Sequence, residues 1–254
     1  PPAAFFVPGR IEVLGKHTDY AGGRSLLCAA EQGFCVVASG RGDRRVTVMN
    51  ADTGDRADLA LAPDLEAALG HWSNYPATVL RRLARNFPEA GIGADLAFAS
   101  DLPPASGMSS SSAFMVAVFL AMAALNELDR VPAYLEAIGP PTDLAGYLGT
   151  VENGRTFGPL AGDTGVGTFG GSEDHTAILC CRASTLSQYR FAPVHFERDV
   201  PMPGRHVFAV AFSGVLAEKT GAALETYNRA SRAVSRVLRI WQDASGSPAP
   251  SLEA

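Results

Sequence analysis

Asp101-Leu-Pro-Pro-Ala-Ser-Gly-Met-Ser-Ser-Ser-Ser-Ala113 is the first informative segment of the chain, because it runs directly into a stretch with helical spacing of apolar residues, Ala113 to Leu128. Small residues let backbone N–H groups approach an anion, and serine hydroxyls add hydrogen-bond donors or a metal ligand. The first turn of a helix adds unpaired N–H groups and the positive end of the helix dipole. The segment therefore predicts a phosphate-binding loop at a helix N-terminus.

A serine-rich helix cap is the alternative interpretation of the same segment. One serine suffices for a cap, whereas serines occupy every position from Ser109 to Ser112. The segment does not match the P-loop pattern GxxxxGK[ST], because no lysine follows Gly107, and no GxGxxG follows a strand. The sequence therefore predicts a nucleotide site of another kind.

Length, composition and charge narrow the class of protein. The chain has 254 residues and is 47% hydrophobic, which predicts one or two globular domains. The apolar run Ala113 to Leu125 is shorter than the roughly twenty residues of a membrane-spanning helix, so it predicts a buried helix. The net charge is −5, and the chain has no run of Lys or Arg residues. Neither feature indicates a nucleic acid or an anionic membrane as the partner. A small molecule is the expected ligand.

Strand and helix patterns mix along the chain without a regular βαβ repeat, which favours an α+β fold. A second domain is expected to begin near residue 185. The four cysteines have no CxxC spacing, so reduced core thiols and a cytoplasmic protein are expected rather than a zinc site. The predicted strands are Phe5–Gly9, Ile11–Leu14, one or more within Ser25–Ala38, Arg45–Met49, Leu96–Ala99, Ala177–Cys181 and Val207–Ala211, and the predicted helices are Leu65–Leu69, Asn74–Asn86, Ala113–Leu128 and Glu218–Trp241.

A second informative segment is the turn-bounded loop within Pro8-Gly-Arg-Ile-Glu-Val-Leu-Gly-Lys-His-Thr-Asp-Tyr-Ala-Gly-Gly23. It offers hydrogen-bond donors and acceptors suited to a polyhydroxylated ligand. A solvated surface turn is the alternative. The polar side chains concerned are Arg10, Lys16, His17, Asp19 and Tyr20.

These segments together resemble the GHMP kinases, and the galactokinases among them. The loop after Pro8 is similar to the galactokinase sugar-binding loop Gly-Arg-Val-Asn-Leu-Ile-Gly-Glu-His-Thr-Asp-Tyr-Asn-Gly-Gly, and the serine-rich segment is similar to Pro-x-x-x-Gly-Leu-Ser-Ser-Ser-Ala-Ala. Gly170-Gly-Ser-Glu-Asp-His175 is similar to Cys-Gly-Ile-Met-Asp-Gln. Ser213-Gly-Val and Glu225-Thr-Tyr-Asn-Arg229 extend the resemblance, which spans residues 8 to 229.

The resemblance implies a phosphoryl-transfer site. Asp174 would accept or orient the proton of a sugar hydroxyl, with Arg10 beside it, although a turn aspartate remains the alternative for Asp174. Ser110 and Glu152 would hold Mg²⁺, although a helix-surface glutamate remains the alternative for Glu152. The triphosphate of ATP would be bound by Gly107, Ser109, Ser110, Ser111 and Ser112.

The resemblance also assigns the sugar-binding residues. Asp19 and Tyr227 would hold sugar hydroxyls, Gly171 would let the sugar approach the backbone, and His17 would either contact the sugar or brace the loop. Lys16 replaces the family's glutamate. An ammonium group can only donate hydrogen bonds, whereas a carboxylate accepts them, so galactose, a pentose, another hexose and a sugar acid all remain open.

Two further departures concern the length of the chain. More positions separate Glu152 from Asp174 than in galactokinases, which indicates a glycine-rich insertion in Gly158 to Gly170. Nothing after Trp241 matches the family's third, glycine-rich motif, so we expect a truncated chain.

The combined expectation is an ATP- and Mg²⁺-dependent kinase that phosphorylates a monosaccharide at its anomeric hydroxyl. Residues 1–185 would form an N-terminal domain like ribosomal protein S5 domain 2, and residues 186–254 part of a ferredoxin-like C-terminal domain. One alternative is a non-catalytic sugar and ATP sensor that recruits a protein partner. Another is a different GHMP activity, such as a mevalonate or homoserine kinase. The sequence leaves the oligomeric state open.

Overall fold

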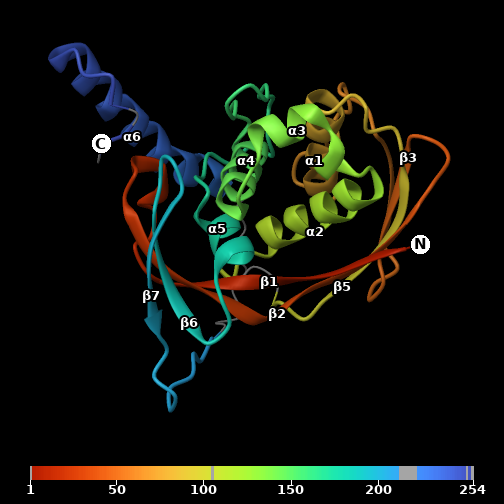
Figure 1. Ribbon diagram of the computed structural model, residues 1–254, viewed down its shortest axis with the longest axis horizontal. Helices are drawn as coiled ribbons and strands as arrows, with labels where there is room; N and C mark the ends of the chain where they lie inside the picture. Colours follow the sequence, from red (N-terminus) through yellow and green to blue (C-terminus); the bar gives the residue numbers. More distant parts are fainter. Residues whose placement is uncertain (1, 104–105, 212–221, 250, 253–254) are drawn as a thin grey trace.

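A computed structural model describes residues 2–103, 106–211, 222–249 and 251–252, without the side chains of residues 222, 223, 226 and 227. One seven-stranded sheet carries a layer of helices on one face (Figure 1). The sheet consists of β1 (Ala3–Leu14), β2 (Arg24–Gly40), β3 (Arg45–Asn50), β4 (Arg56–Ala60), β5 (Ala94–Ser100), β6 (Thr185–Arg190) and β7 (His195–Pro201). The helices are α1 (Asn74–Asn86), α2 (Ser110–Leu125), α3 (Pro132–Ala137), α4 (Pro141–Asn153), α5 (Glu173–Cys180) and α6 (Ala222–Ser245), with 3₁₀ turns η1 (Asp19–Ala21) and η2 (Leu128–Arg130).

Strand β2 organises the sheet. The strand order in the sheet is β4-β3-β5-β2-β6-β7. The seventh strand, β1, is not part of this order and pairs with β2. β5 pairs with residues 34–40 of β2 and β6 with residues 24–27, while β1 follows β2 along nearly its whole length. Only β3 and β5 are parallel among the described strand pairs. The sheet is therefore mixed and mostly antiparallel, which confirms the α+β prediction.

Helix α2 is the centre of the core. Nearly every residue from Ser112 to Met122 is buried, and α2 packs on β1 and β2 and against α1, α4 and α5. A helix that is apolar all round must be enclosed on all sides, which is why this segment lies between the sheet and the other helices. The prediction of a buried helix after the serine-rich loop is confirmed.

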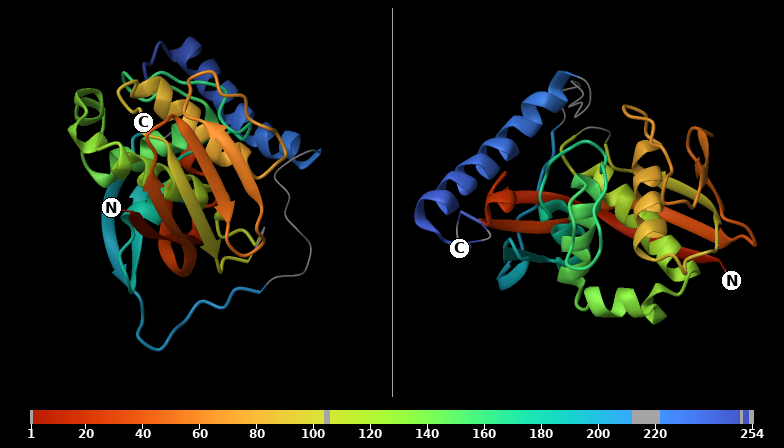
Figure 2. Two further views of the ribbon diagram at one scale, coloured as in Figure 1. Left: turned by 90° about the vertical axis from the view of Figure 1, so that its right-hand side faces the viewer. Right: turned by 90° about the horizontal axis from the view of Figure 1, so that it is seen from above.

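Helix α6 extends away from the layer formed by α1 to α5 (Figures 1 and 2). The sheet hydrogen bonds between β2 and β6 cross the predicted domain boundary at 185, and the division of the chain there stays a prediction. Within the described part of the chain, no helix is both long and apolar enough to span a membrane.

Three short segments differ from the predictions. Ala177–Cys181 was predicted as a strand, but its residues belong largely to α5, because a short buried apolar run fits either structure. Leu65–Leu69 is not helical; five residues form too few intrahelical hydrogen bonds to offset helix nucleation. Val207–Ala211 is not a strand either, and no described strand pairs with it.

The remaining predicted elements agree with the structure at their centres. Phe5–Gly9 and Ile11–Leu14 belong to one strand, β1, whose register shifts between Pro8 and Arg10 and again between Glu12 and Leu14. The predicted helix Glu218–Trp241 corresponds to α6 from Ala222 on, and its first four residues lie outside the described part.

Candidate active site

Arg10 on β1 connects three segments that are far apart in the sequence. Its Nε donates a hydrogen bond to Asp174 Oδ1 at 2.7 Å, and its Nη1 donates to the Gly107 carbonyl at 2.6 Å. Its backbone N–H donates to the Met108 carbonyl at 3.2 Å. The predicted catalytic pair is thus in direct contact, at the start of the serine-rich loop.

The charges around Arg10 keep its guanidinium protonated. Burial by itself lowers the pKa of Arg10, but the charge and hydrogen bond of Asp174, with smaller contributions from neighbouring carboxyl groups, outweigh burial and raise this pKa. The Arg10 and Asp174 side chains retain only 11% and 21% exposure. The ion pair is therefore partly withdrawn from water and only weakly screened by salt.

The serine-rich loop has the backbone of an anion site. Gly107 has φ +79°, and a side chain there would meet nothing within 4 Å, so its surroundings are open. Ser109 has a left-handed backbone (φ 58°), and no side chain caps the start of α2. Its buried Oγ has no hydrogen-bond partner in the described structure. Open space, an unpaired hydroxyl and free helix N–H groups suit a phosphate. Ser110 begins α2, and Ser111 and Ser112 continue its first turn.

Glu152 at the end of α4 contacts the same helix start. Ser112 Oγ donates to Glu152 Oε2 at 2.8 Å and lies 3.4 Å from Asp174 Oδ2. His175 Nε2 lies 3.3 Å from Glu152 Oε2. The structure therefore places Glu152 beside the phosphate loop, in contact with the last serine of the run.

These groups fit a magnesium ion that also binds phosphate. Carboxylate and hydroxyl oxygens are the ligands that Mg²⁺ prefers, usually with one or two carboxylates and the substrate's phosphates. Among the described residues, no three His, Cys, Asp or Glu side chains are grouped so as to hold a metal ion alone. Residues such as Glu152, Ser110 and Ser112 would therefore hold the ion together with a nucleotide.

The loop after β1 is folded by its own hydrogen bonds. Gly15 has φ +100°, and Thr18 Oγ1 donates to the carbonyls of Gly15 at 2.7 Å and Arg24 at 3.0 Å. Lys16 and His17 are exposed at the tip of this loop, and His17 has φ 59°. Lys16, predicted to select the sugar, and His17, predicted to contact the sugar or brace the loop, are thus presented to solvent by a hydrogen-bonded turn.

Asp19, in contrast, is buried against the start of α5. Its Oδ2 accepts the Glu173 N–H at 3.2 Å, and a side chain at Gly171 would come within 2.2 Å of the same oxygen. Burial, and to a lesser extent the charge of Asp174, raise the pKa of Asp19 to about 6 despite backbone hydrogen bonds that lower it. Gly171 is therefore required for the approach of Asp19 to the backbone, a role that the sequence motif did not reveal.

Tyr227 lies in α6, but its side chain is outside the described part of the structure, as is the whole Ser213-Gly-Val segment. The neighbouring Asn228 joins α6 to the glycine-rich loop. Its Oδ1 accepts the Phe169 N–H at 2.9 Å, and its Nδ2 donates to the Gly167 carbonyl at 2.8 Å. The Tyr-Asn-Arg segment is thus attached to the loop that precedes Asp174.

Two buried arginines on α1 hold the other end of that loop. Arg81 Nε donates to Asp163 Oδ2 at 2.8 Å, and the fully buried Arg82 lies 3.5 Å from Asp163 Oδ1 and donates to the Arg155 carbonyl. Sequence reasoning missed these residues, because two arginines in a helical pattern look like a solvated face. Their occurrence on the same helix as a long apolar stripe was the available signal.

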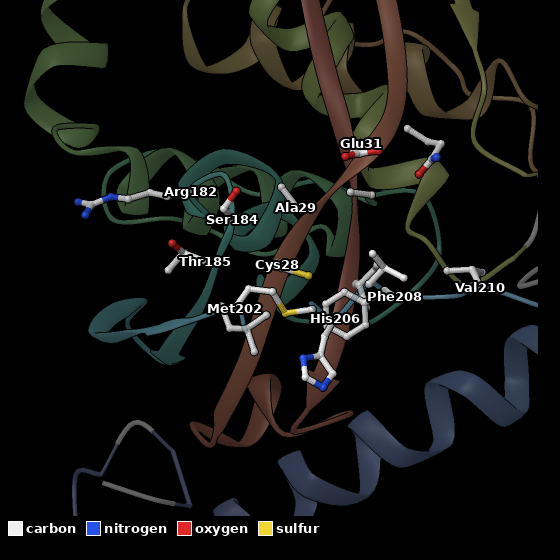
Figure 3. A pocket seen from close by; sticks show the side chains of 15 residues that line it. Cys28, Ala29, Glu31, Arg182, Ser184, Thr185, Met202, His206, Phe208 and Val210 are labelled. Atoms are coloured by element: carbon white, nitrogen blue, oxygen red, sulfur yellow. The ribbon is translucent and has the colours of Figure 1, made fainter. Parts of the chain in front are cut away.

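A cavity of about 310 Å³ lies between β2 and the segment 202–210 (Figure 3). Cys28, Met202 and Phe208 give it an apolar lining, with Arg182 and Glu31 among its polar residues. None of the residues predicted to bind sugar or ATP, or to act in catalysis, lines this cavity. This cavity is therefore separate from the groups that the motifs predict.

Comparisons with known proteins agree with the motifs. Residues 1–40 match the family model of the galactokinase galactose-binding signature, and residues 74–149 match the model of the GHMP kinases N terminal domain. Galactokinase from Roseiflexus sp. (strain RS-1) is 31% identical over 237 residues, which are 92% of this chain and 54% of the relative. Galactokinase from Actinobacillus pleuropneumoniae serotype 3 is 34% identical over 134 residues, which are 53% of this chain and 35% of the relative.

Solved structures share the fold. Lactococcus lactis galactokinase, determined in complex with galactose, superposes with a TM-score of 0.68 at 22% identity, over 94% of this chain and 57% of that one. Methanococcus jannaschii mevalonate kinase gives 0.55 at 13% identity, over 78% and 56% of the two chains. The chain spans about half the length, or less, of the relatives that it matches. It is a galactokinase-like member of the GHMP kinase superfamily.

Proposed function

We propose that this protein transfers the γ-phosphoryl group of ATP to the anomeric hydroxyl of a monosaccharide. The observation that supports this most directly is the double contact of Arg10, which donates to Asp174 at 2.7 Å and to the Gly107 carbonyl at 2.6 Å. One guanidinium thereby links the carboxylate at the attacking hydroxyl to the loop that would hold the phosphates. Phosphoryl transfer depends on this kind of positioning and charge stabilisation.

In this proposal the sugar hydroxyl oxygen forms a bond to the γ-phosphorus, and the bond from that phosphorus to the bridging oxygen of ADP breaks. Asp174 orients the hydroxyl and accepts its proton as the new bond forms. Arg10 stabilises charge that develops on the transferred group. The hydrogen bond between the two side chains fixes both before substrate arrives.

The residues of the serine-rich loop bind the triphosphate. Ser109 supplies an unpaired hydroxyl, and Gly107 supplies open space for an oxygen to approach. Mg²⁺, when bound, neutralises charge on the phosphate oxygens. Glu152 and Ser110 are its proposed protein ligands, and the contact of Ser112 with Glu152 makes Ser112 a third candidate.

For the sugar, Asp19, His17 and Tyr227 are the proposed hydroxyl contacts. The galactose-binding signature over residues 1–40 supports a sugar substrate. Lys16 is exposed at the loop tip and can only donate. Galactose, a pentose, another hexose and a sugar acid are therefore the compounds to compare.

We also propose that residues 1–185 form the S5 domain 2-like unit and that residues 186–254 belong to a ferredoxin-like unit. The position of α6 away from the main helical layer supports such a division (Figure 1). A cytoplasmic location suits the four cysteines, all of which are free thiols.

A sensor that binds sugar and ATP without turnover is the second candidate. The Arg10–Asp174 pair favours the kinase, because binding alone does not need a charged pair at the reacting atoms. The same site could also serve another GHMP substrate, such as mevalonate or homoserine.

The test is a coupled assay of ADP release with the full-length natural protein, across pentoses, hexoses, uronic acids, mevalonate and homoserine. Asp174→Asn should lower kcat by about 10² or more and leave the dissociation constant for ATP within a few-fold of wild type. Asp64→Asn, which also exchanges a carboxylate for an amide but at an exposed position outside the matched motifs, is the matched control. Sugar binding without ADP release in the wild type would support the sensor, and full activity of Asp174→Asn would remove the base from the mechanism.

A further inference from the structure

Glu173 is a buried carboxyl group beside the candidate active site. It is 4% exposed, and its Oε1 has no hydrogen-bond partner in the described structure. The charged groups that act on it are Glu12 on β1, Asp19 in η1 and Asp174 on the next position of α5, with Arg10 nearby. The motif comparison assigned no role to Glu173, and the proposed mechanism does not use it.

The guanidinium of Arg10 forms ion pairs with carboxylates other than Glu173. Arg10 Nε is 2.7 Å from Asp174, and its Nη2 is 3.8 Å from Glu12. An ionised carboxylate on Glu173 would be buried next to three other carboxyl groups and would share Arg10, the nearby cation, with Asp174 and Glu12. Burial and neighbouring negative charge both disfavour the ionised form.

We propose that Glu173 is a neutral carboxylic acid in the working protein and that its hydroxyl donates to Glu12, which makes Glu173 a positioning residue for Arg10. A proton shared with Glu173 would reduce the negative charge that Glu12 presents to Arg10, and this leaves Asp174, at 2.7 Å against 3.8 Å for Glu12, as the main partner of the guanidinium. Burial chiefly, then the charge of Asp19 and the hydrogen bond to Glu12, raise the pKa of Glu173 to about 9, which agrees with this assignment.

The two residues depart together from the galactokinase motifs quoted above. Glu12 stands where that motif has asparagine, and Glu173 where it has methionine. The change at Glu173 alone would leave a buried polar group without this partner, which is destabilising. Together they form one hydrogen bond between β1 and α5. Each of the two carboxyl groups thus supplies the hydrogen-bond partner of the other.

Ionisation of Glu173 would damage the site. The added charge would lie beside Asp19 and Asp174 and would draw Arg10 from the phosphate loop. Catalysis should therefore fall on the alkaline side as Glu173 loses its proton. This expectation rests on the proposed function, whereas the protonation state itself does not.

Infrared spectroscopy of the ligand-free full-length protein at about pH 8 tests the protonation state without turnover. Asp19 is ionised at that pH, and Glu173 should still show the C=O stretch of a protonated carboxyl group. The band should disappear in Glu173→Gln and remain in Asp64→Asn. A wild-type spectrum without the band, or an unchanged band in Glu173→Gln, would overturn the proposal.

The pH dependence of kcat tests the positioning role. Wild type should lose activity above about pH 9, and Glu173→Gln, which still donates, should move that loss by about one pH unit or more. Glu173→Met cannot donate and should have a kcat about tenfold below that of Glu173→Gln at pH 7. A purely structural role would change only the amount of folded protein. The positioning role would therefore be refuted if kcat fell at the same alkaline pH in wild type and Glu173→Gln, or if Glu173→Met and Glu173→Gln had equal kcat values at pH 7. If the wild-type protein shows the infrared band of the protonated carboxyl group but has no kinase activity, the protonation state of Glu173 is upheld and the proposed reaction is rejected.

Discussion

Glu173→Gln should change how protein stability depends on pH, and the sign follows from the direction of the pKa shift. The pKa of Glu173 rises from 4.5 in the unfolded chain to about 9 in the folded protein, mainly through burial. Between these values the folded state holds a proton that the unfolded state has released. The contribution of Glu173 to stability is therefore complete below about pH 4.5 and is lost as the pH rises through about 9. Glutamine does not titrate and carries no such dependence.

The size of the expected change in the free energy of unfolding follows from the binding of one proton. While the folded state binds one proton more than the unfolded state, the free energy of unfolding falls by about 1.4 kcal/mol per pH unit. From pH 7 to 8.5 wild type should lose about 2 kcal/mol relative to Glu173→Gln. Asp19, with its pKa raised to about 6, is ionised across most of this window in both proteins, so its contribution cancels.

The assay is urea unfolding of wild type and Glu173→Gln at several pH values between 7 and 8.5. The difference between their free energies of unfolding should grow with pH, and Asp64→Asn should stay parallel to wild type. Parallel pH profiles for wild type and Glu173→Gln would show that Glu173 is ionised in the folded state, contrary to the reasoning above.

Three other substitutions address the sugar and the metal. Lys16→Glu should raise kcat/KM for galactose relative to the natural sugar by about tenfold or more, roughly 1.4 kcal/mol; an unchanged ratio of the two kcat/KM values would place sugar selection elsewhere. Gly171→Ala should lower kcat/KM for the sugar by about 10² with KM for ATP little changed, because the new Cβ would lie 2.2 Å from Asp19 Oδ2; a normal sugar KM would show that Asp19 does not hold the sugar. Ser112→Ala should raise the Mg²⁺ requirement by about tenfold, since Ser112 holds Glu152 at 2.8 Å, and Ser110→Ala should raise it as well; a Mg²⁺ titration that is unaltered in either variant would exclude that serine.

The helices that could be predicted from the sequence are those with long segments that are either amphipathic or apolar throughout. The apolar run of α2 and the amphipathic pattern of α1 each extend over more than three turns, so their period is unambiguous. The segment Ala177–Cys181 is short, and the helix to which most of it belongs begins four residues earlier, at Glu173, outside the apolar run that was used for the prediction. Pairing of β6 with β2 was not predictable, because it depends on residues that lie about 160 positions apart.

The motifs predicted the contact partners of the site better than its electrostatics. Arg10 and Asp174 were expected to lie together, and they form a direct hydrogen bond. The carboxyl pair of Glu12 and Glu173 was missed, because each residue falls inside a motif whose other positions carry the resemblance. His175, in contact with Glu152, was missed for the same reason. Departures within a matched motif are where a chain's own chemistry is found.

The position of Arg10 depends on the backbone of β1 rather than on a flexible loop. A side chain at Gly9 would lie 2.6 Å from Leu102 Cδ2 and 2.9 Å from the Met108 carbonyl, so only glycine lets the strand approach the phosphate loop this closely. The register shift between Pro8 and Arg10 frees the Arg10 N–H from the sheet, and it donates to Met108 instead. Strand and loop are therefore joined directly, and the guanidinium is oriented in the ligand-free protein. Preorganised charge of this kind costs no rearrangement during the reaction, which is where electrostatic catalysis gains most.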